Sequence, residues 1–360
     1  MRRLEFGWFV PTSGDTDAYG HAEAFIPPSM AMFERVTRAA EAAGFEYILI
    51  PVQTACWEAW ITSAMLVART QSIKPLVAAR PGYINPALLA KMIAAFDQLS
   101  GGRVCINLIA GASDEEAAAD GIQYAKEQRY ALMDEEVTLL KTLWSTTGRV
   151  DFDGAFHKLK GALIVPKPLQ KPWPPFYLGG GSRQAWEISA KHSDVHLFWG
   201  DTPERIGRQI AEIRELARKH GRHDAIGFGM RLQVIVRERE ADAWAAADRL
   251  IADLGERHKA RIANMFNASE ANRRMKELAK TEGMKIGPHL WTGLTLARPG
   301  AGVAVVGDPE QVAGTLQQFI DVGCHSFCLS GYLHDEEAER FGRLVMPLLK
   351  GRNAARMAAE

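Results

Sequence analysis

The sequence has few cysteines and no long apolar run. Four cysteines in 360 residues are too few for a disulfide scaffold. Cys324 and Cys328 lie four residues apart with no second cluster, so no metal site is expected. No apolar stretch approaches the roughly 18 residues that a transmembrane helix needs. These absences favour a reduced, cytoplasmic protein without a membrane span.

The chain also has no excess of positive or negative charge. The chain has 43 basic and 43 acidic side chains, a formal net charge of zero. Nucleic acids and anionic membranes require a basic surface, so neither is expected as a partner. The first residues, MRRLEFGWFVPT, enter a strand-like run without the apolar core or small-residue cleavage site of a signal peptide, and we interpret them as mature sequence.

Short apolar runs alternate with helical patterns along the chain. Helices are expected over 29–44, 58–70, 86–98 and 126–144. Eight strands are expected over 6–11, 47–51, 75–80, 104–111, 175–181, 194–200, 227–236 and 326–332. Eight β-then-α units predict an α/β fold, a (β/α)₈ TIM barrel. The alternative, an open doubly wound sheet, would normally carry a GxGxxG after the first strand, and none is present there.

Two stretches depart from this repeat. Residues 145–174 resemble a small β excursion that ends in a proline-rich entry to the fifth strand. Residues 255–300 are polar, basic and helical, and form the largest insertion, between strands seven and eight. Loops after the strands build the active site of a barrel, so this insertion is either a lid or a solvated decoration. We expect one domain over 1–360.

The stretch FGMRLQVIV, residues 228–236, places two polar side chains on one face of an apolar strand. Phe228, Met230, Leu232, Val234 and Val236 share one face, and Arg231 and Gln233 lie on the other. The second face therefore meets water or lines a pocket that needs a fixed positive charge.

A glycine turn, YLGGGSRQAW, joins the fifth strand to a helix. Successive glycines allow backbone N–H groups to converge on an anion at the helix N-terminus. The turn carries Gly180, Gly181, Ser182 and Arg183. Phosphate sites of barrels often lie at such a turn, although GGGS alone is also typical of a plain turn.

Further polar or aromatic residues follow other strands. Cys56 lies just past strand two, where a small packing residue is the usual interpretation and no local histidine would activate a nucleophile. Each such residue also has an ordinary structural interpretation, but their gathering at one barrel end predicts a site. The set comprises Cys56, Asn107, Trp199, Arg231, Gln233, Tyr332 and His334.

The motifs WFVPT, LSGGR, QRY, YLGGGS, WGDTPE, ARPGAG and SGYLH carry a family likeness. Together they resemble the two-component alkanesulfonate monooxygenases of the bacterial luciferase-like superfamily, over nearly the whole chain. The resemblance implies a (β/α)₈ barrel whose insertion closes over the site. It also implies FMNH₂ and O₂ as cosubstrates, and cleavage of a sulfonate C–S bond to an aldehyde and sulfite.

The resemblance implies roles for individual residues. The flavin phosphate would lie near Tyr130, Gly180, Gly181, Ser182 and Arg183, with Asn107 close to the ring. Cys56 would line the substrate pocket. The catalytic residues around the sulfonate would be Arg231, Gln233, Arg298, Tyr332, His334 and Trp199. An NAD(P)H-dependent flavin reductase would be a separate partner, and the chain would form dimers or tetramers.

Gln233 departs from the family pattern, which typically has a histidine at this position. Glutamine cannot titrate near neutral pH, so proton transfer would fall to His334 or Tyr332. Alternatively, the amide orients a substrate with polar substituents. Another organosulfur or polar substrate therefore remains an alternative, as does a deazaflavin-dependent oxidoreductase of the same superfamily.

Overall fold

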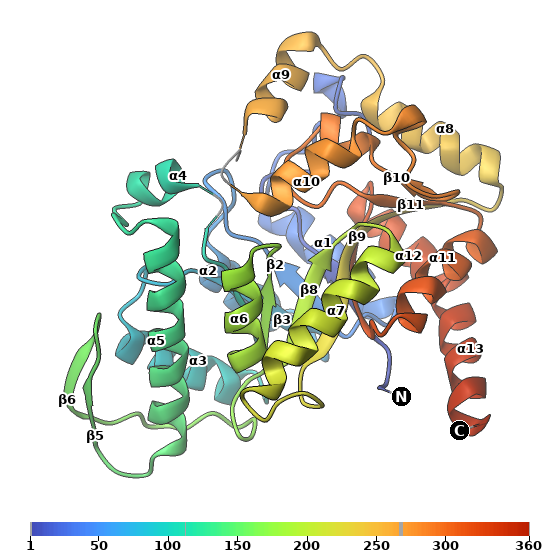
Figure 1. The fold of residues 1–360 in the computed structure, drawn as a ribbon. Helices are drawn as coiled ribbons and strands as arrows, with labels where there is room; N and C mark the ends of the chain where they lie inside the picture. Colours follow the sequence, from blue (N-terminus) through green and yellow to red (C-terminus); the bar gives the residue numbers. More distant parts are fainter. Residues whose placement is uncertain (1, 112, 266–268, 360) are drawn as a thin grey trace.

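Eight parallel strands form a closed barrel that helices surround (Figure 1). This computed structural model describes residues 2–111, 113–265 and 269–359. The strands follow the order β1, β2, β3, β4, β7, β8, β9 and β12, and β12 pairs with β1 to close the ring. The predicted (β/α)₈ TIM barrel is confirmed.

Each barrel strand overlaps its predicted range. The bounds are β1 Glu5–Phe9, β2 Tyr47–Ile50, β3 Lys74–Ala79, β4 Cys105–Leu108, β7 Phe176–Gly179, β8 Val195–Trp199, β9 Gly227–Val236 and β12 Ser326–Ser330. Four strands lie outside the ring: β5 Val150–Asp153, β6 Lys158–Ala162, β10 Leu290–Trp291 and β11 Ala304–Gly307. The hairpin of β5 and β6 is the β excursion expected over 145–174.

Several helices begin at a side chain that caps their first turn. Ser29, Ser182, Thr202 and Asp308 each accept a hydrogen bond from a backbone N–H of the helix that follows. The bounds are α1 Met30–Ala42, α2 Ala59–Val67, α3 Pro86–Leu99, α4 Asp114–Ala119, α5 Lys126–Ser145, α6 Arg183–His192, α7 Pro203–Arg218, α8 Glu240–Ile251, α9 Glu256–Asn264, α10 Glu270–Leu278, α11 Pro309–Asp321, α12 His334–Leu344 and α13 Met346–Ala359. Over the described ranges, no helix has both the length and the apolar character that crossing a bilayer needs.

The barrel interior is filled by alternate residues of its strands. One side chain in two along each strand points inward, and the others pack on the helices. An inner cluster joins Tyr47, Leu76, Cys105, Tyr177 and Cys328 from five different strands. This packed layer closes the barrel below the carboxyl ends of the strands, so a ligand that enters at that end stays above the layer.

The insertion after β9 is joined to the barrel as an extension of its sheet. Residues 233–236 of β9 pair in parallel with β11, and β10 adds to β11 in antiparallel. Helices α8, α9 and α10 lie with these strands above the carboxyl end of the barrel (Figure 1). The sequence analysis placed the insertion at 255–300 and missed both strands. The run VAVVG, residues 303–307, is short and apolar and could have been recognised as a strand.

Gly7 tests how tightly the inner layer is packed. A methyl group on Gly7 would lie 2.0 Å from a ring atom of Tyr47. We expect Gly7→Ala to lower the free energy of unfolding by about 1–3 kcal/mol, because overpacking displaces the buried ring. Gly148→Ala is the matched control, since its methyl group meets nothing within 4 Å. Urea unfolding of both variants makes the comparison, and equal stabilities would contradict a closely packed layer.

Candidate active site

Arg231 lies inside the barrel at the middle of β9, beside Trp199 at the carboxyl end of β8. Its Nη1 donates to Ser330 Oγ at 2.9 Å and to the backbone oxygen of Leu232 at 3.0 Å. The guanidinium carbon stands 4.7 Å from the ring centre of Phe9 on β1. The side chain is only 6% exposed, so the polar face of β9 lines the interior and does not meet water.

Gln233 is fully buried one position further along the same face, and its amide is bonded at both ends. Ser330 Oγ donates to Gln233 Oε1 at 2.5 Å, and Gln233 Nε2 donates to the backbone oxygen of Ala301 at 3.0 Å. Ser330 thus links Gln233 to Arg231, and Ala301 links Gln233 to the insertion. This geometry favours a positioning role over the substrate contact that the sequence suggested.

Arg298, from the insertion, faces the same region as Arg231. Its Nη1 donates to Tyr332 Oη at 3.0 Å, and its guanidinium carbon lies 6.0 Å from the ring centre of Phe9. Tyr19 Oη also donates to Tyr332 Oη at 3.0 Å. Since Tyr332 accepts both bonds, its own O–H proton is left to donate elsewhere.

Arg231 and Arg298 bring two positive charges to this end of the barrel. Neither Arg231 nor Arg298 forms an ion pair with any carboxylate in the described ranges. Burial lowers the pKa of Arg231, and the nearby charge of Arg298 lowers it further. Buried cations without a counter-charge are costly, so an anionic ligand would stabilise this arrangement.

His334 is oriented by a carboxylate that the sequence analysis missed. Asp15 Oδ1 bonds His334 Nδ1 at 2.8 Å, and Asp15 Oδ2 accepts from the His334 backbone N–H at 2.9 Å. Burial opposes ionisation of Asp15, but the charge and hydrogen bonds of His334 outweigh it and lower the pKa of Asp15. His334 Nε2 is buried without a hydrogen-bond partner among the described residues. Asp15 follows the first strand, and that position was the signal available in the sequence.

Cys56 lies in the loop after β2 and is partly buried. Burial raises the pKa of its thiol above the ordinary value. A thiol of this kind is protonated at neutral pH and is therefore a poor nucleophile. The structure favours the packing or binding role, which the sequence analysis preferred over covalent catalysis.

The glycine turn between β7 and α6 places two hydroxyl groups at a helix N-terminus. Ser182 caps α6, and its Oγ donates to Tyr130 Oη on α5 at 3.3 Å. A methyl group on Gly180 would lie 2.8 Å from the Cβ of Ala185, so the turn is too tight for a side chain. Arg183 is not bonded to these two hydroxyl groups. Its Nε pairs instead with Glu187 Oε1 at 3.2 Å, one turn further along α6.

A small cavity separates the glycine turn from the insertion. Gly180, Gly181 and Trp199 line its barrel side, and Glu270, Ala271 and Arg274 line the side formed by α10. Asn107 lies on the inward face of β4, is 8% exposed, and forms no side-chain hydrogen bond with another described residue. Its amide is therefore available to a ligand held between this turn and the arginine pair.

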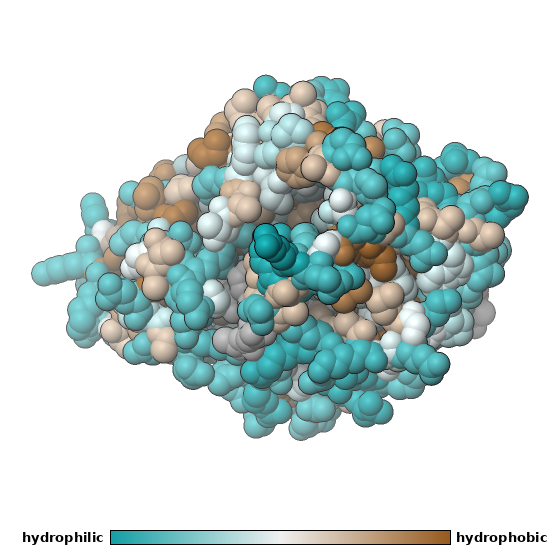
Figure 2. Space-filling model, turned by 90° about the horizontal axis from the view of Figure 1, so that it is seen from above, coloured by the Kyte–Doolittle hydropathy of each residue, from teal (hydrophilic) through white to brown (hydrophobic). Residues whose placement is uncertain are grey.

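A buried carboxylate fastens the insertion over the site. Asp201, just past β8, accepts two hydrogen bonds from Arg274 of α10, at 2.7 Å from Nε and 3.0 Å from Nη2. Arg205 of α7 adds an ion pair to Asp201 at 3.1 Å. Viewed from above, hydrophilic side chains cover most of this face, and apolar side chains show between them near its middle (Figure 2). The insertion is thus held at one point by a bidentate contact.

A model of the luciferase-like monooxygenase family matches residues 4–326. The chain belongs to this family. The prediction of a flavin-dependent monooxygenase is confirmed at that level, and the alkanesulfonate branch stays a prediction. Members of the family use reduced flavin and O₂, and the superfamily also contains deazaflavin-dependent enzymes.

Solved structures share the fold at low identity. The EDTA monooxygenase EmoA from Chelativorans sp. BNC1 is 18% identical, with a TM-score of 0.79 over 98% of this chain and 94% of that chain. The long-chain alkane monooxygenase LadA is 17% identical, with a TM-score of 0.75 over 98% and 92%. The coenzyme F420-dependent tetrahydromethanopterin reductase from Methanopyrus kandleri is 17% identical, with a TM-score of 0.68 over 97% and 100%. Identities this low show the fold alone.

The described residues contain no cluster that resembles a metal site. No group of three or more histidine, cysteine, aspartate or glutamate side chains in the described part of the chain could hold a metal ion. The cytoplasmic location and the oligomeric state stay predictions.

Asp201 provides a test of the fastened insertion. Asp201→Asn removes the charge that holds Arg274, and we expect the opening free energy of the insertion to fall by about 1.5 kcal/mol, the worth of a charged hydrogen bond. Cleavage by trypsin within 253–285 should then rise roughly tenfold, because proteolysis follows the open population.

Asp242→Asn is the matched control. Asp242 pairs with Arg239 at the exposed start of α8, where an ion pair contributes little. Equal cleavage of the Asp201 and Asp242 variants would show that Asp201 does not hold the insertion closed.

Proposed function

We propose that this chain is an FMNH₂- and O₂-dependent monooxygenase that cleaves the C–S bond of an organosulfonate, giving an aldehyde and sulfite. A separate NAD(P)H-dependent reductase would supply the reduced flavin. One oxygen atom of O₂ ends in the aldehyde and the other in water, while FMNH₂ provides two electrons and becomes FMN. The observation that carries the proposal is the pair of buried Arg231 and half-buried Arg298, which has no carboxylate partner among the described residues.

A sulfonate suits this arginine pair. It is a permanent anion with three acceptor oxygens, and guanidinium groups are permanently charged donors. Arg231 has only its Nη1 bonded to protein, so the rest of the fork is available to such an oxygen. Ser330 and Gln233 hold Arg231 in place, and Phe9 supplies an apolar wall against which the substrate carbon would pack.

Tyr332 and His334 are the groups that could move protons. Tyr332 Oη accepts from Tyr19 and Arg298, so its own proton can be donated toward the substrate. His334 is held by Asp15 through Nδ1, and its Nε2 could take or give a proton at the same end of the barrel. Proton transfer would then not require a histidine at position 233.

The residues around the glycine turn fit a flavin phosphate. Tyr130 and Ser182 offer hydroxyl groups at the N-terminus of α6, and Gly180 and Gly181 leave space beside them. Asn107 offers a buried amide that could bond the ring. When bound, reduced FMN supplies the electrons that activate O₂. The insertion fastened by Asp201 would exclude water during this chemistry.

Two alternative functions are compatible with the same geometry. A carboxylate would also pair with Arg231 and Arg298, and the EDTA monooxygenase of the same fold indicates that another polar anion is a reasonable alternative substrate. The F420-dependent reductase of the same fold keeps a deazaflavin-dependent reaction as a second alternative. Anaerobic titration separates the cofactors, because our proposal requires binding of FMNH₂ and not of a deazaflavin alone.

Sulfite release is the direct test. The full chain, coupled to any NAD(P)H-dependent flavin reductase, is assayed with alkane, aryl and sugar sulfonates in air. We expect sulfite and aldehyde in equal amounts from at least one class, in an FMN-dependent reaction. Absence of sulfite across the panel, together with oxygenation of a polycarboxylate, would replace the sulfonate by the carboxylate alternative.

Arg231→Ala tests the anion contact. Losing a buried guanidinium from a charged substrate should lower kcat/KM for sulfite release at least about 100-fold, since such contacts contribute roughly 2–5 kcal/mol. The dissociation constant for FMNH₂ should change less than about twofold, because Arg231 does not line the cavity at the glycine turn. Arg208→Ala on the exposed face of α7 is the control. Unchanged turnover in Arg231→Ala would refute the assignment.

A further inference from the structure

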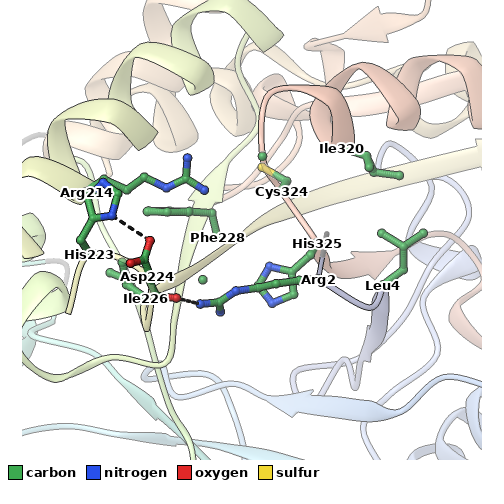
Figure 3. Close-up of a pocket in the computed structure, with 12 residues that line it drawn as sticks. Arg2, Leu4, Arg214, His223, Asp224, Ile226, Phe228, Ile320, Cys324 and His325 are labelled. Carbon is green, nitrogen blue, oxygen red and sulfur yellow. Dashed lines mark hydrogen bonds and ion pairs between the residues drawn. The ribbon is translucent and has the colours of Figure 1, made fainter. Parts of the chain in front are cut away.

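A second cavity lies at the opposite end of the barrel from the proposed active site. Its volume is about 440 Å³, within the range of small-molecule sites. It is formed where β1, β9 and β12 begin, together with the end of α7 and the turn before β12 (Figure 3). The packed inner layer around Tyr47 separates it from the arginine pair above. No role described so far uses this cavity.

Two arginines give this cavity a positive charge. Arg214 forms no hydrogen bond or ion pair with a described residue, and its guanidinium lies 5.4 Å from the ring centre of Phe228. Arg2 donates to the backbone oxygens of Asp224 and Ala225, the latter at 2.8 Å, and these bonds do not neutralise its charge. Burial lowers the pKa of Arg2, and the charge of Arg214 lowers it further.

The carboxylate that lines the cavity does not balance these charges. Asp224 is bonded to the ring of His223 at 2.9 Å, and its side chain is 99% exposed. Figure 3 shows Asp224 turned toward His223, while the Arg2 side chain extends between Asp224 and His325. The lining therefore carries two fixed positive charges against one carboxylate that is already engaged.

The absence of a side chain at Gly227 leaves space for Arg2 and His325. A methyl group on Gly227 would lie 2.3 Å from His325 Cε1 and 2.5 Å from Arg2 Nη1. His325 Nδ1 is buried without a hydrogen-bond partner among the described residues. Burial and the charge of Arg2 lower the pKa of His325 to about 4, so the ring is neutral at pH 7 and offers a hydrogen bond rather than a charge.

The remaining lining is apolar. Leu4, Phe228, Ile320 and Cys324 contribute side chains next to the basic groups (Figure 3). These four side chains are only 1–7% exposed, so the apolar wall is small, and an organic ion with a short body would gain more contact with it than an inorganic ion. The combination selects a molecule with one charged end and an apolar body.

We propose that this cavity binds a small organic acid anion at a site separate from the active site. The anionic group would contact Arg214, Arg2 and His325, and the short apolar body would pack on Leu4 and Ile320. The ligand class is therefore a carboxylate or sulfonate with a short aliphatic or aromatic body. The proposal does not depend on the oxygenation reaction.

Hexanoate is the probe, with sulfate as the inorganic comparison. Titration calorimetry on the full chain without flavin should give a hexanoate dissociation constant at least tenfold lower than that for sulfate. Arg214→Gln should weaken hexanoate binding about tenfold or more, because a charged hydrogen bond is lost. Arg208→Gln, on the same helix but outside the cavity, should leave binding unchanged. Arg214 and Arg208 are exposed, so both variants should fold, which their melting temperatures check.

The Arg231→Ala variant shows at which end of the barrel hexanoate binds. Binding that survives in Arg231→Ala and weakens in Arg214→Gln supports the second cavity. Loss only in Arg231→Ala would mean that hexanoate binds at the active site, and it would overturn the proposal. Equal affinity for sulfate and hexanoate, or equal binding by the Arg214 and Arg208 variants, would also overturn it. Sulfite release plays no part, so failure of the proposed reaction is a separate outcome.

Discussion

The carboxyl end of this barrel holds two guanidinium groups, one buried and one half-buried, that have no carboxylate partner among the described residues. Arg231 comes from the barrel wall and Arg298 from the insertion, and both approach the ring of Phe9. Their mutual repulsion opposes closure unless an anion lies between them. The surrounding groups, including Ser330 and Tyr332, therefore accept hydrogen bonds from the arginines without neutralising them. Such a site is complementary to an anion that enters from outside.

The insertion depends on the same strand as the anion site. β9 continues beyond the barrel, and its last residues pair with β11. Gln233 lies where the two pairings meet, bonded to Ser330 on one side and Ala301 on the other. A shift of the insertion at Ala301 would thus reach Arg231 through three hydrogen bonds, by way of Gln233 and Ser330. Asp201 fastens the far side of the insertion through Arg274. The position of the insertion and that of Arg231 are therefore mechanically connected.

Much of the fold could be predicted from sequence because its signals are local. Apolar runs of strand length separated by helical patterns repeat eight times, and a capping serine follows the glycine turn. The strands β10 and β11 were missed, because they pair with the end of β9 and not with a neighbour in sequence. Asp15 and Tyr19 were missed for a related reason. Their partners lie more than 300 residues away, and no local spacing reveals them.

The sequence by itself determined the barrel, the shared strand face of Arg231 and Gln233, and the family, because periodicity and motif order are properties of the chain. Only the tertiary structure decided what those residues contact. It bonded Gln233 to Ser330 and Ala301, turned Arg183 toward Glu187, and left Arg231 and Arg298 without a described carboxylate. It also joined the starts of three strands into a basic cavity at the other end. Charge balance and hydrogen-bond satisfaction depend on distances in space, which spacing along the chain does not specify.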